Sequence, residues 1–397
     1  MKNLKQILSV MMTMVLVVTM ANFMPDQAIA ANNPIILVPN IGRQDILYGS
    51  TDSKTYQVTI DKDGYSYLEF TMNGLDKNIK DGWNIQILDK DYNIISEDNH
   101  VVKNLKGKTL NFQKDSIVYI KVTASGSDSF APSFVNYQIK FTTVTDSTWE
   151  KETGNTAGEA TTLKNDTICN GNLYLETDAD YYKYIVEKNG YTTFSFEYSI
   201  SDIEQIKQGW KVSVFDQNLS LISTYNFNSK AETKKLNFKK GTVLYIKVEA
   251  YSANSYGCPV DVTYTLTAKN SESKAWELEK NNTWASATML KNSVMKYGNF
   301  YMDQDKDMYY FIAPSTGRYS VTFASSVAST EAGSGWNLSF YNAGKKLLRM
   351  ETGLTSKRTF TIPVKRGARI YIKLEGATTW STSELVGITY SMKVRKR

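Results

Sequence analysis

Two acidic patterns recur in this sequence at a spacing of 127 residues. Each has a Glu-x-Glu segment, an Asn three residues after it, and an Asp-x-Asp segment further on. In an extended segment, carboxylates two residues apart point the same way, roughly 7 Å from each other. A facing Asp pair with an Asn or backbone carbonyl offers the roughly six to eight oxygen ligands that calcium takes. The candidate ligands are Glu150, Glu152, Asn155, Asp178 and Asp180, and then Glu277, Glu279, Asn282, Asp305 and Asp307.

A simpler interpretation of these residues is a solvated acidic linker whose Asp-rich turns cap their own backbone. An upstream version of the pattern is incomplete, because it keeps Asp52 but has Lys54 where the second Asp stands, and it lacks the Glu-x-Glu segment. We therefore expect calcium as a cofactor of the two later copies and not of the first.

Histidine-dependent catalysis is restricted to one residue, since His100 is the only histidine of the chain. It ends the polar run Glu97–His100, which we predict to be a surface turn, so neither a Ser-His-Asp triad nor a zinc site is expected. Paired carboxylates can hydrolyse glycosides, but these pairs are repeated between copies, which does not fit one active site. We expect no enzymatic activity.

The two cysteines, Cys169 and Cys258, both fall in the second copy, before its first and its last expected strand. In an exported protein such a pair is more often bridged than free. We predict a Cys169–Cys258 disulfide, which would contribute roughly 2–4 kcal/mol to stability. The alternative is a coincidence of two loop positions.

Tryptophans divide into two groups. Trp83, Trp210 and Trp336 recur after a Gly in each copy, which predicts a structural role at the core. Trp284 and Trp380 occur only in the third copy. Aromatic side chains without a repeated packing role can form a surface on which a sugar or a peptide stacks; ordinary packing is the alternative.

Three copies of one pattern organise the chain. A late segment recurs as Tyr119–Val122, Tyr245–Val248 and Tyr371–Leu374, and the segment from Trp149 returns at Trp276. We predict domains at 31–143 (a diverged repeat 1), 144–270 (repeat 2) and 271–397 (repeat 3). About 120 residues per copy suffices for a hydrophobic core.

Short alternating runs separated by turn residues predict strands in repeat 2. Eight such runs and no convincing amphipathic helix favour an antiparallel two-sheet sandwich. The predicted strands are Asn172–Leu175, Tyr181–Glu187, Thr192–Tyr198, Lys211–Phe215, Leu221–Tyr225, Lys234–Phe238, Val243–Ala250 and Val262–Ala268.

Residues 1–30 are typical of a signal peptide, with Lys2 and Lys5, the apolar run Ile7–Met20 and the cleavage site Ala28-Ile29-Ala30. An uncleaved membrane anchor is the alternative. No later segment reaches the roughly 20 apolar residues of a transmembrane helix. We expect a secreted protein, either free or associated with the cell surface.

Charge is mild after cleavage, with 44 basic and 39 acidic residues and a net charge of +5. The charges are interspersed, which does not indicate a nucleic-acid partner. The exception is Lys393–Arg397, which could contact an anionic cell wall but is more simply interpreted as a solvated tail.

The pattern Trp-Glu-x-Glu-x-x-Asn-Thr followed by Asp-x-Asp-x-Tyr resembles the bacterial pre-peptidase C-terminal domain. It is similar to the collagen-binding domains of clostridial collagenases. The resemblance covers repeats 2 and 3 in full and repeat 1 by its strand pattern only. It implies a jelly-roll-like sandwich that binds calcium at the acidic residues. The matching positions are Glu150, Glu152, Asn155, Asp178, Asp180 and Tyr182, and then Glu277, Glu279, Asn282, Asp305, Asp307 and Tyr309.

The sequence therefore predicts an all-β chain of three tandem antiparallel β-sandwich domains, jelly-roll-like, after a signal peptide. We interpret it as a non-catalytic, multivalent binding or adhesion protein. Its expected partner is an extracellular polymer, namely a matrix protein, a cell-wall polymer or a polysaccharide. The alternatives are an accessory or inhibitor-like partner of a separately encoded secreted enzyme, and a structural surface protein.

Overall fold

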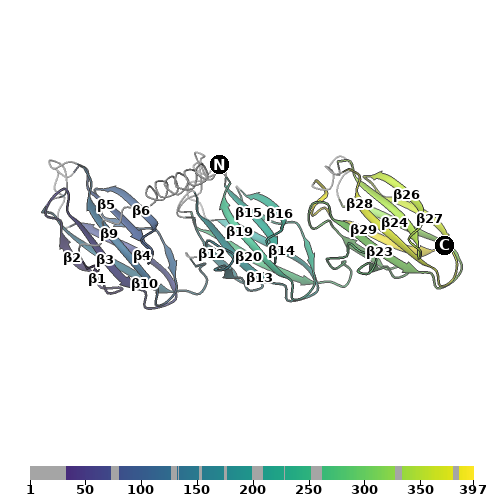
Figure 1. Cartoon of the computed structure of the whole chain (residues 1–397), viewed down its shortest axis with the longest axis horizontal. Helices are drawn as coiled ribbons and strands as arrows, with labels where there is room; N and C mark the ends of the chain where they lie inside the picture. Colours follow the sequence, from purple (N-terminus) through teal and green to yellow (C-terminus); the bar gives the residue numbers. More distant parts are fainter. Residues whose placement is uncertain are drawn as a thin grey trace, which may run out of the picture. The chain divides into compact units, whose positions relative to one another are not determined.

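The computed structural model describes residues 33–72, 80–126, 132, 134–151, 154–173, 177–198, 209–227, 229–251, 262–326, 333–378 and 384–397. The chain is all-β, and its six sheets form a two-sheet sandwich in each predicted repeat (Figure 1). The predicted fold class is confirmed. The expected signal peptide lies outside the described residues. Over the described part of the chain, we find no helix with the length and apolar character needed to cross a membrane.

Repeat 1 has one sheet of strand order β1-β3-β9-β5-β6 and one of order β2-β10-β4-β7, with β8 paired to β4. Its strands are β1 (Ile35–Ile36), β2 (Arg43–Ile46), β3 (Ser53–Thr59), β4 (Gly64–Met72), β5 (Trp83–Leu88), β6 (Ile94–Val101), β7 (Leu105–Lys106), β8 (Leu110–Phe112), β9 (Ile117–Ala124) and β10 (Asn136–Thr145).

Repeat 2 has the corresponding orders β11-β13-β19-β15-β16 and β12-β20-β14-β17, with β18 paired to β14. Its strands are β11 (Thr161–Thr162), β12 (Ile168–Gly171), β13 (Ala179–Ile185), β14 (Gly190–Tyr198), β15 (Trp210–Asp216), β16 (Leu221–Phe227), β17 (Ala231–Glu232), β18 (Leu236–Phe238), β19 (Val243–Ala250) and β20 (Tyr264–Glu272).

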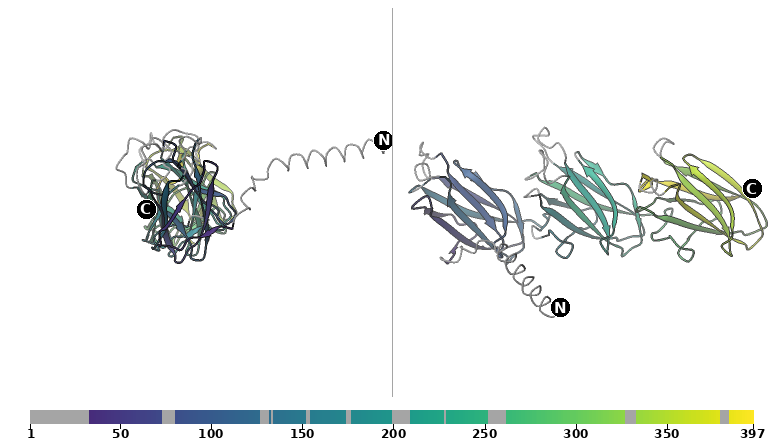
Figure 2. Two further views of the ribbon diagram at one scale, coloured as in Figure 1. Left: turned by 90° about the vertical axis from the view of Figure 1, so that its left-hand side faces the viewer. Right: turned by 45° about the horizontal axis from the view of Figure 1, so that its top comes forward.

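Repeat 3 has the orders β21-β23-β28-β25-β26 and β22-β29-β24-β27. Its strands are β21 (Thr288–Met289), β22 (Met295–Gly298), β23 (Lys306–Ile312), β24 (Gly317–Ser325), β25 (Trp336–Asn342), β26 (Leu347–Leu354), β27 (Arg358–Val364), β28 (Arg369–Gly376) and β29 (Tyr390–Lys396). Figure 2 shows the two layers of the sandwiches from two further directions.

Alternation of apolar and polar residues explains why these segments become half-buried strands. In β19, Leu244, Ile246 and Val248 are buried while their neighbours lie on the outer face. The same pattern on the facing sheet places Phe194 and Phe196 opposite them in one core. The core of each sandwich therefore lies between its two sheets.

The repeated Gly-Trp pair has a backbone cause. Gly82, Gly209 and Gly335 have φ of 64°, 71° and 73°, a left-handed conformation that glycine adopts most readily. A Cβ at Gly335 would lie 2.6 Å from the carbonyl oxygen of Leu354. The turn sends the following Trp336 fully into the core, with an exposure of 0%, which agrees with the predicted structural role.

One predicted strand of repeat 2 is wrong. β12 spans Ile168–Gly171, whereas we expected a strand at Asn172–Leu175, of which residues 174 and 175 lie outside the described residues. The other seven predictions overlap β13, β14, β15, β16, β18, β19 and β20. β12 pairs with β20 through Cys169 and Leu266, so long-range pairing, and not local alternation, selects the strand.

The predicted domain boundaries at 31–143, 144–270 and 271–397 stay predictions. The chain divides into two compact units, of which the second consists of Ile60–Leu68, Lys106–Ser116 and Thr142–Arg397. All of repeats 2 and 3 belong to that second unit.

Candidate metal centre

The acidic residues of repeat 3 are brought together by a short pairing of the segment that precedes β21. Trp276 forms a parallel bridge with Tyr297 on β22, and the amide of Glu277 donates to the carbonyl of Tyr297 at 2.9 Å. This extended segment points Glu277 and Glu279 inward. Asp305 and Asp307 come from the turn before β23 and from β23 itself.

Three carboxylates meet closely in this centre. One oxygen each of Glu277, Glu279 and Asp307 lies within 4.8 Å of the other two. Their side chains are buried, with exposures of 0%, 5% and 0%, and Asp305 is 2% exposed. Asn282 Nδ2 donates to Asp305 Oδ1 at 2.8 Å. The structure thus gathers all five candidate ligands of repeat 3.

Hydrogen bonds hold the carboxylates in place, and of their donors only Tyr309 is among the residues singled out from the sequence. Asn281 Nδ2 donates to Glu277 Oε2 at 2.8 Å. The hydroxyl of Tyr309 donates to Glu277, and the hydroxyl of Tyr390 donates to Asp307. The two hydroxyl oxygens are 2.7 Å apart. The recurrence of this tyrosine pair in every repeat is the sequence feature that could have predicted these donors.

Burial makes this centre electrostatically costly. Burial and the Asp305 charge raise the pKa of Glu277 to about 8, and burial raises that of Asp305 to about 6. Burial and neighbouring carboxylates raise the pKa values of Glu279 and Asp307 well above their ordinary range. Like charges held together in a dry site disfavour ionisation, so these groups need protons or a cation.

Oxygen atoms without a hydrogen-bond partner make the residues of this centre suited to a cation. Within the described part of the chain, Glu279 Oε1, Asp307 Oδ1, Asn281 Oδ1 and Asn282 Oδ1 are buried and have no hydrogen-bond partner. Every one of these atoms is an oxygen, and hard cations such as Ca²⁺ prefer oxygen ligands.

Repeat 2 carries a related centre. Glu150 and Asp180 are each 1% exposed and Asp178 is 9% exposed. Both carboxylate oxygens of Glu150 and Oδ1 of Asp180 are buried without a hydrogen-bond partner among the described residues. Burial raises the pKa values of Glu150 and Asp180 well above their ordinary range, and the charge of Asp178 adds to the rise in both. Glu152 lies outside the described residues.

The remaining candidate ligand of repeat 2 is Asn155. With its amide oriented to satisfy both neighbours, its Nδ2 donates to Asp178 Oδ1 and to the carbonyl of Ala179, each at 3.2 Å. This bond matches the one between Asn282 and Asp305 in repeat 3. The assignment of both sets of residues to calcium stays a prediction.

Cys169 lies on β12 beside the centre of repeat 2. Its thiol is buried, and burial together with the Glu150 and Asp180 charges raises its pKa. Cys169 has no disulfide partner among the described residues. Cys258 lies outside the described residues, so the Cys169–Cys258 disulfide stays a prediction.

Repeat 1 has an ion pair in the equivalent place. Lys54 on β3 donates to Asp45 Oδ1, and Tyr56 Oη donates to Asp45 Oδ2 at 3.1 Å. Tyr56 and Tyr137 form the same hydroxyl pair, at 2.7 Å. Burial acts to raise the pKa of Asp45, but the hydrogen bond and charge of Lys54 outweigh burial and lower it. An ammonium group therefore balances the carboxylate without a metal.

Register explains how Asp45 enters this site. Asp45 pairs with Tyr137, as Gly298 pairs with Tyr390 in repeat 3. A Cβ at Gly298 would lie 2.2 Å from Glu277 Oε1. Repeat 1 lacks the Glu-x-Glu segment, so the space is free for the Asp45 side chain.

Removing the Lys54 charge is expected to destabilise the chain. Asp45 and Lys54 have side-chain exposures of 8% and 19%, so K54M removes the less exposed of the two cations that pair with a nearly buried carboxylate and leaves only Arg43, at 3.4 Å. We expect a loss of about 2 kcal/mol in unfolding free energy, measured by urea denaturation. K90M removes the exposed Lys90–Asp91 pair and should leave stability unchanged. Equal effects of the two substitutions would contradict the assigned role of Lys54.

An aromatic cluster on the outer face of repeat 3 surrounds Trp284. Its half-buried ring packs edge-on against Tyr341 and Tyr371, with ring centroids 5.1 and 5.2 Å away. Lys345 Nζ lies 5.7 Å from the Trp284 ring centroid, and Arg369 lies 4.9 Å from that of Tyr310. The second candidate of this kind, Trp380, lies outside the described residues.

His100 lies at the exposed end of β6 and not in a turn. Its Nδ1 is 3.0 Å from the hydroxyl of Ser125. Ser125 is only 3% exposed, so this hydroxyl is not presented to a substrate as a nucleophile would be.

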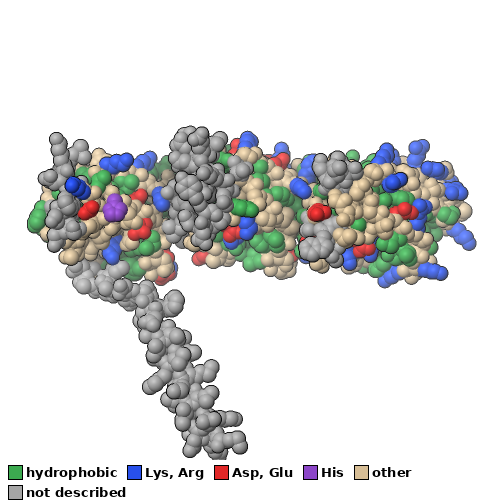
Figure 3. Space-filling model, turned by 90° about the horizontal axis from the view of Figure 1, so that it is seen from above, with side chains coloured by type: hydrophobic (Ala, Val, Ile, Leu, Met, Phe, Trp, Pro, Cys, Tyr) green, Lys and Arg blue, Asp and Glu red, His purple; other side chains and the backbone are tan. Residues whose placement is uncertain are grey.

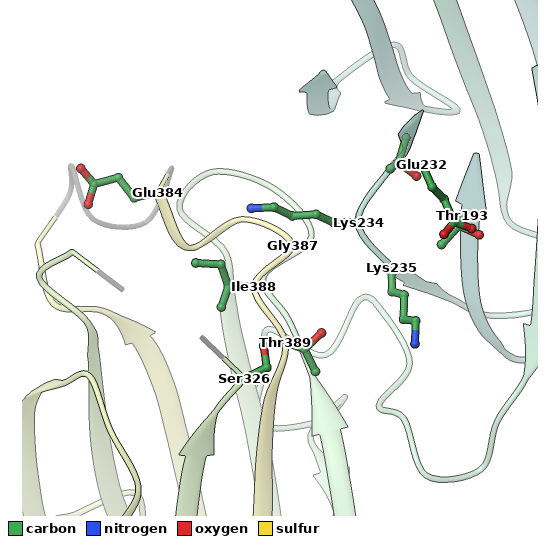
Figure 4. Close-up of a pocket in the computed structure, with 10 residues that line it drawn as sticks. Thr193, Glu232, Lys234, Lys235, Ser326, Glu384, Gly387, Ile388 and Thr389 are labelled. Carbon is green, nitrogen blue, oxygen red and sulfur yellow. The ribbon is translucent and has the colours of Figure 1, made fainter. Parts of the chain in front are cut away.

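A hollow in the second unit is shown in Figure 4. Lys234 and Lys235 extend into it, and Gly387, Ile388 and Thr389 line it as well. Lys234 Nζ donates to the carbonyl of Val386 at 3.1 Å, and burial lowers the pKa of Lys234. This lysine is committed to a backbone carbonyl, and we assign no ligand to the hollow.

Comparisons with known proteins show only distant similarity. No family model and no curated protein matches the chain. The pre-peptidase C-terminal domain of a collagenase from Bacillus anthracis is 13% identical, covering 28% of this chain and 98% of that domain, with a TM-score of 0.22. Tandem CBM51 modules of a family 98 glycoside hydrolase from Streptococcus pneumoniae SP3-BS71 are 11% identical, covering 58% and 84%, with a TM-score of 0.19. A triple jelly roll protein of an archaeal virus is 10% identical, covering 90% and 88%, with a TM-score of 0.23.

Proposed function

We propose that this chain is a secreted, non-catalytic binding protein whose third repeat contacts an extracellular polymer through the cluster around Trp284. The observation that carries the proposal is the packing of this half-exposed indole against Tyr341 and Tyr371 on one outer sheet face. Rigid aromatic rings offer a large contact area at low entropic cost, to sugars and peptides alike.

The neighbouring charges support a recognition role. Lys345 and Arg369 lie over rings of the cluster, so polar donors flank the apolar surface. Single contacts of this kind are weak, and tandem modules multiply affinity when several engage one polymer.

The acidic centres of repeats 2 and 3 serve structure in this proposal. Calcium bound by Glu277, Glu279 and Asp307 would fix the segment before β21 to its own sandwich. Glu150, Asp178 and Asp180 would do the same in repeat 2. Their burial supports a structural ion over a catalytic one, since a substrate could not reach the carboxylates.

A retention assay tests the aromatic cluster. We expect the full chain to bind at least one member of a panel of collagen, peptidoglycan and neutral polysaccharides. W284A/W380A should weaken retention about tenfold, since each lost aromatic contact is worth roughly 0.5–1.5 kcal/mol.

The control for this assay lies in repeat 1. Tyr92 stacks on Tyr119 with centroids 4.4 Å apart, and Tyr119 occupies the position of Tyr371. Y92A/Y119A removes one aromatic ring from β9 and one from the connection between β5 and β6, and it should leave retention intact. Unchanged retention of W284A/W380A would reject the cluster as the contact and favour a structural or accessory role.

A further inference from the structure

One end of the repeat 3 sandwich is built from five segments that meet. We call it the basic end and define it as residues 291–294, 313–318, 342–346, 365–369 and 395–397. Gly367 donates to the carbonyl of Ala313 at 2.8 Å, and Arg397 to that of Arg318 at 2.9 Å. The amide of Lys396 donates to Asn292 Oδ1 at 3.1 Å.

The basic end carries ten Lys or Arg residues and no Asp or Glu. The equivalent segments of repeat 2 are 164–167, 186–191, 216–220, 239–243 and 269–271, with five basic and three acidic residues. Those of repeat 1 are 38–41, 60–65, 89–93, 113–117 and 142–144, with three basic and five acidic residues. The net side-chain charge of this end therefore rises from −2 to +2 to +10 along the chain.

The fold itself does not require this charge. In one turn, Asp89 and Asp216 accept backbone hydrogen bonds from Asn93 and Ser220. In repeat 3, neutral Asn342 accepts the same bond from Lys346 at 2.9 Å.

A second turn shows the same replacement. Asp63 caps the amide of Lys114 in repeat 1, and Asn189 caps that of Lys240 in repeat 2. Thr316 caps that of Arg366 in repeat 3. Each repeat therefore keeps the side-chain cap of this turn, but in repeats 2 and 3 the capping residue is neutral.

The cations of the basic end face solvent. Arg318, Lys365, Arg366 and Lys396 are exposed, and blue side chains gather at the right-hand limit of repeat 3 in Figure 3. Among the described residues, the ion pairs of repeat 3 that involve only its own residues, such as Lys373–Glu375 and Arg349–Glu351, lie on its sheets. Ten like charges repel one another, so this end gains from an external polyanion.

We propose that the basic end binds an anionic polysaccharide, one whose sugar chain carries sulfate, phosphate or carboxylate groups. The proposal deepens the binding function above by naming the charge of a partner. Lys345 and Arg369 belong to the basic end and also lie over rings of the Trp284 cluster. Sugar rings and their anionic groups would thus meet adjacent surfaces.

The ring geometry favours a glycan over a nucleic acid. Trp284 stands at 86° to Tyr341 and at 87° to Tyr371. Single-stranded nucleic acids are held by successive bases stacked on aromatic faces, and perpendicular rings do not offer such a series.

The proposal is tested by measuring the affinity of the full chain for dextran sulfate. Uncharged dextran of equal length is the reference. We expect binding to dextran sulfate that weakens steeply with salt, because counterions are released. K365Q/R366Q/K396Q/R397Q should weaken it at least about tenfold in 0.15 M salt. The control K188Q/K239Q/K240Q/K269Q removes four charges from the same end of repeat 2 and should change it less than about twofold.

Equal losses in the two variants, or no binding of dextran sulfate, would overturn the proposal. Tighter binding of single-stranded DNA with the same variant dependence would overturn the choice of a glycan. Comparison with W284A/W380A separates this inference from the proposed function. A neutral polymer or collagen that is retained through the Trp284 cluster should be insensitive to the basic-end variant. Circular dichroism of both variants shows whether they fold.

Discussion

Calcium is expected to raise the unfolding temperature of the calcium-free chain by about 10 °C at saturation. The physical reason is the burial of four carboxylates in repeat 3, of which Glu277, Glu279 and Asp307 converge within 4.8 Å. A bound cation removes their repulsion and satisfies oxygen atoms that have no hydrogen-bond partner. Differential scanning calorimetry at pH 8, after removal of divalent ions by a chelating resin, measures the shift as calcium is returned.

Neutral substitutions at the centre distinguish bound calcium from a nonspecific effect of salt on stability. E277Q/D307N should reduce the calcium response and, without calcium, make the chain at least as stable as the parent, because two buried charges are gone. D303N changes an exposed carboxylate two residues from Asp305 and should keep the full response. A parent chain indifferent to calcium, or an undiminished response in E277Q/D307N, would contradict the assigned centre.

The sequence predicted the acidic centre of repeat 3 because its signal is local. Glu277-x-Glu279 and Asp305-x-Asp307 are each two residues apart in extended segments, which fixes the direction of their side chains. The copy in repeat 2 then showed that the spacing is not accidental. Such short-range information also predicted the sandwich, since alternation along β19 and its copies is a property of single strands.

Contacts between strands that are distant in the sequence could not be predicted from local residue patterns. Asp45 reaches Lys54 only because its strand pairs with β10 at Tyr137, and no spacing in the sequence announces that register. The β12 prediction failed for the same reason, since pairing with β20 selects Ile168–Gly171. Asn281 was not predicted as a donor to Glu277, because the neighbouring Asn282 is the residue that recurs in repeat 2, as Asn155.

The pH dependence of stability is expected to reverse when calcium binds. In the calcium-free native state the pKa of Glu277 is raised to about 8 and that of Asp305 to about 6. In the unfolded chain these groups titrate near their ordinary values, about 4.3 and 3.9. Between the two values the native state holds the extra proton, so raising the pH favours unfolding.

The Glu277 contribution is therefore fully present below about pH 4.5 and is lost as the pH rises to about 8. The Asp305 contribution is lost between about pH 4 and 6. Each group changes the unfolding free energy by up to about 1.4 kcal/mol per pH unit within its window. Glu279 and Asp307 act in the same direction, because burial raises their pKa values as well.

With calcium bound the sign is opposite. The cation favours the ionised carboxylates, so protons compete with it and acidification from pH 8 to 5 weakens both calcium binding and stability. Groups elsewhere, such as Asp45 with its lowered pKa, add a common background. Comparing the parent with E277Q/D307N, each by urea unfolding at pH 5, 6, 7 and 8 with and without calcium, removes that background. The difference should slope downward with pH in the calcium-free chain and upward in the calcium-loaded one, and parallel slopes would show that these carboxylates do not share a cation.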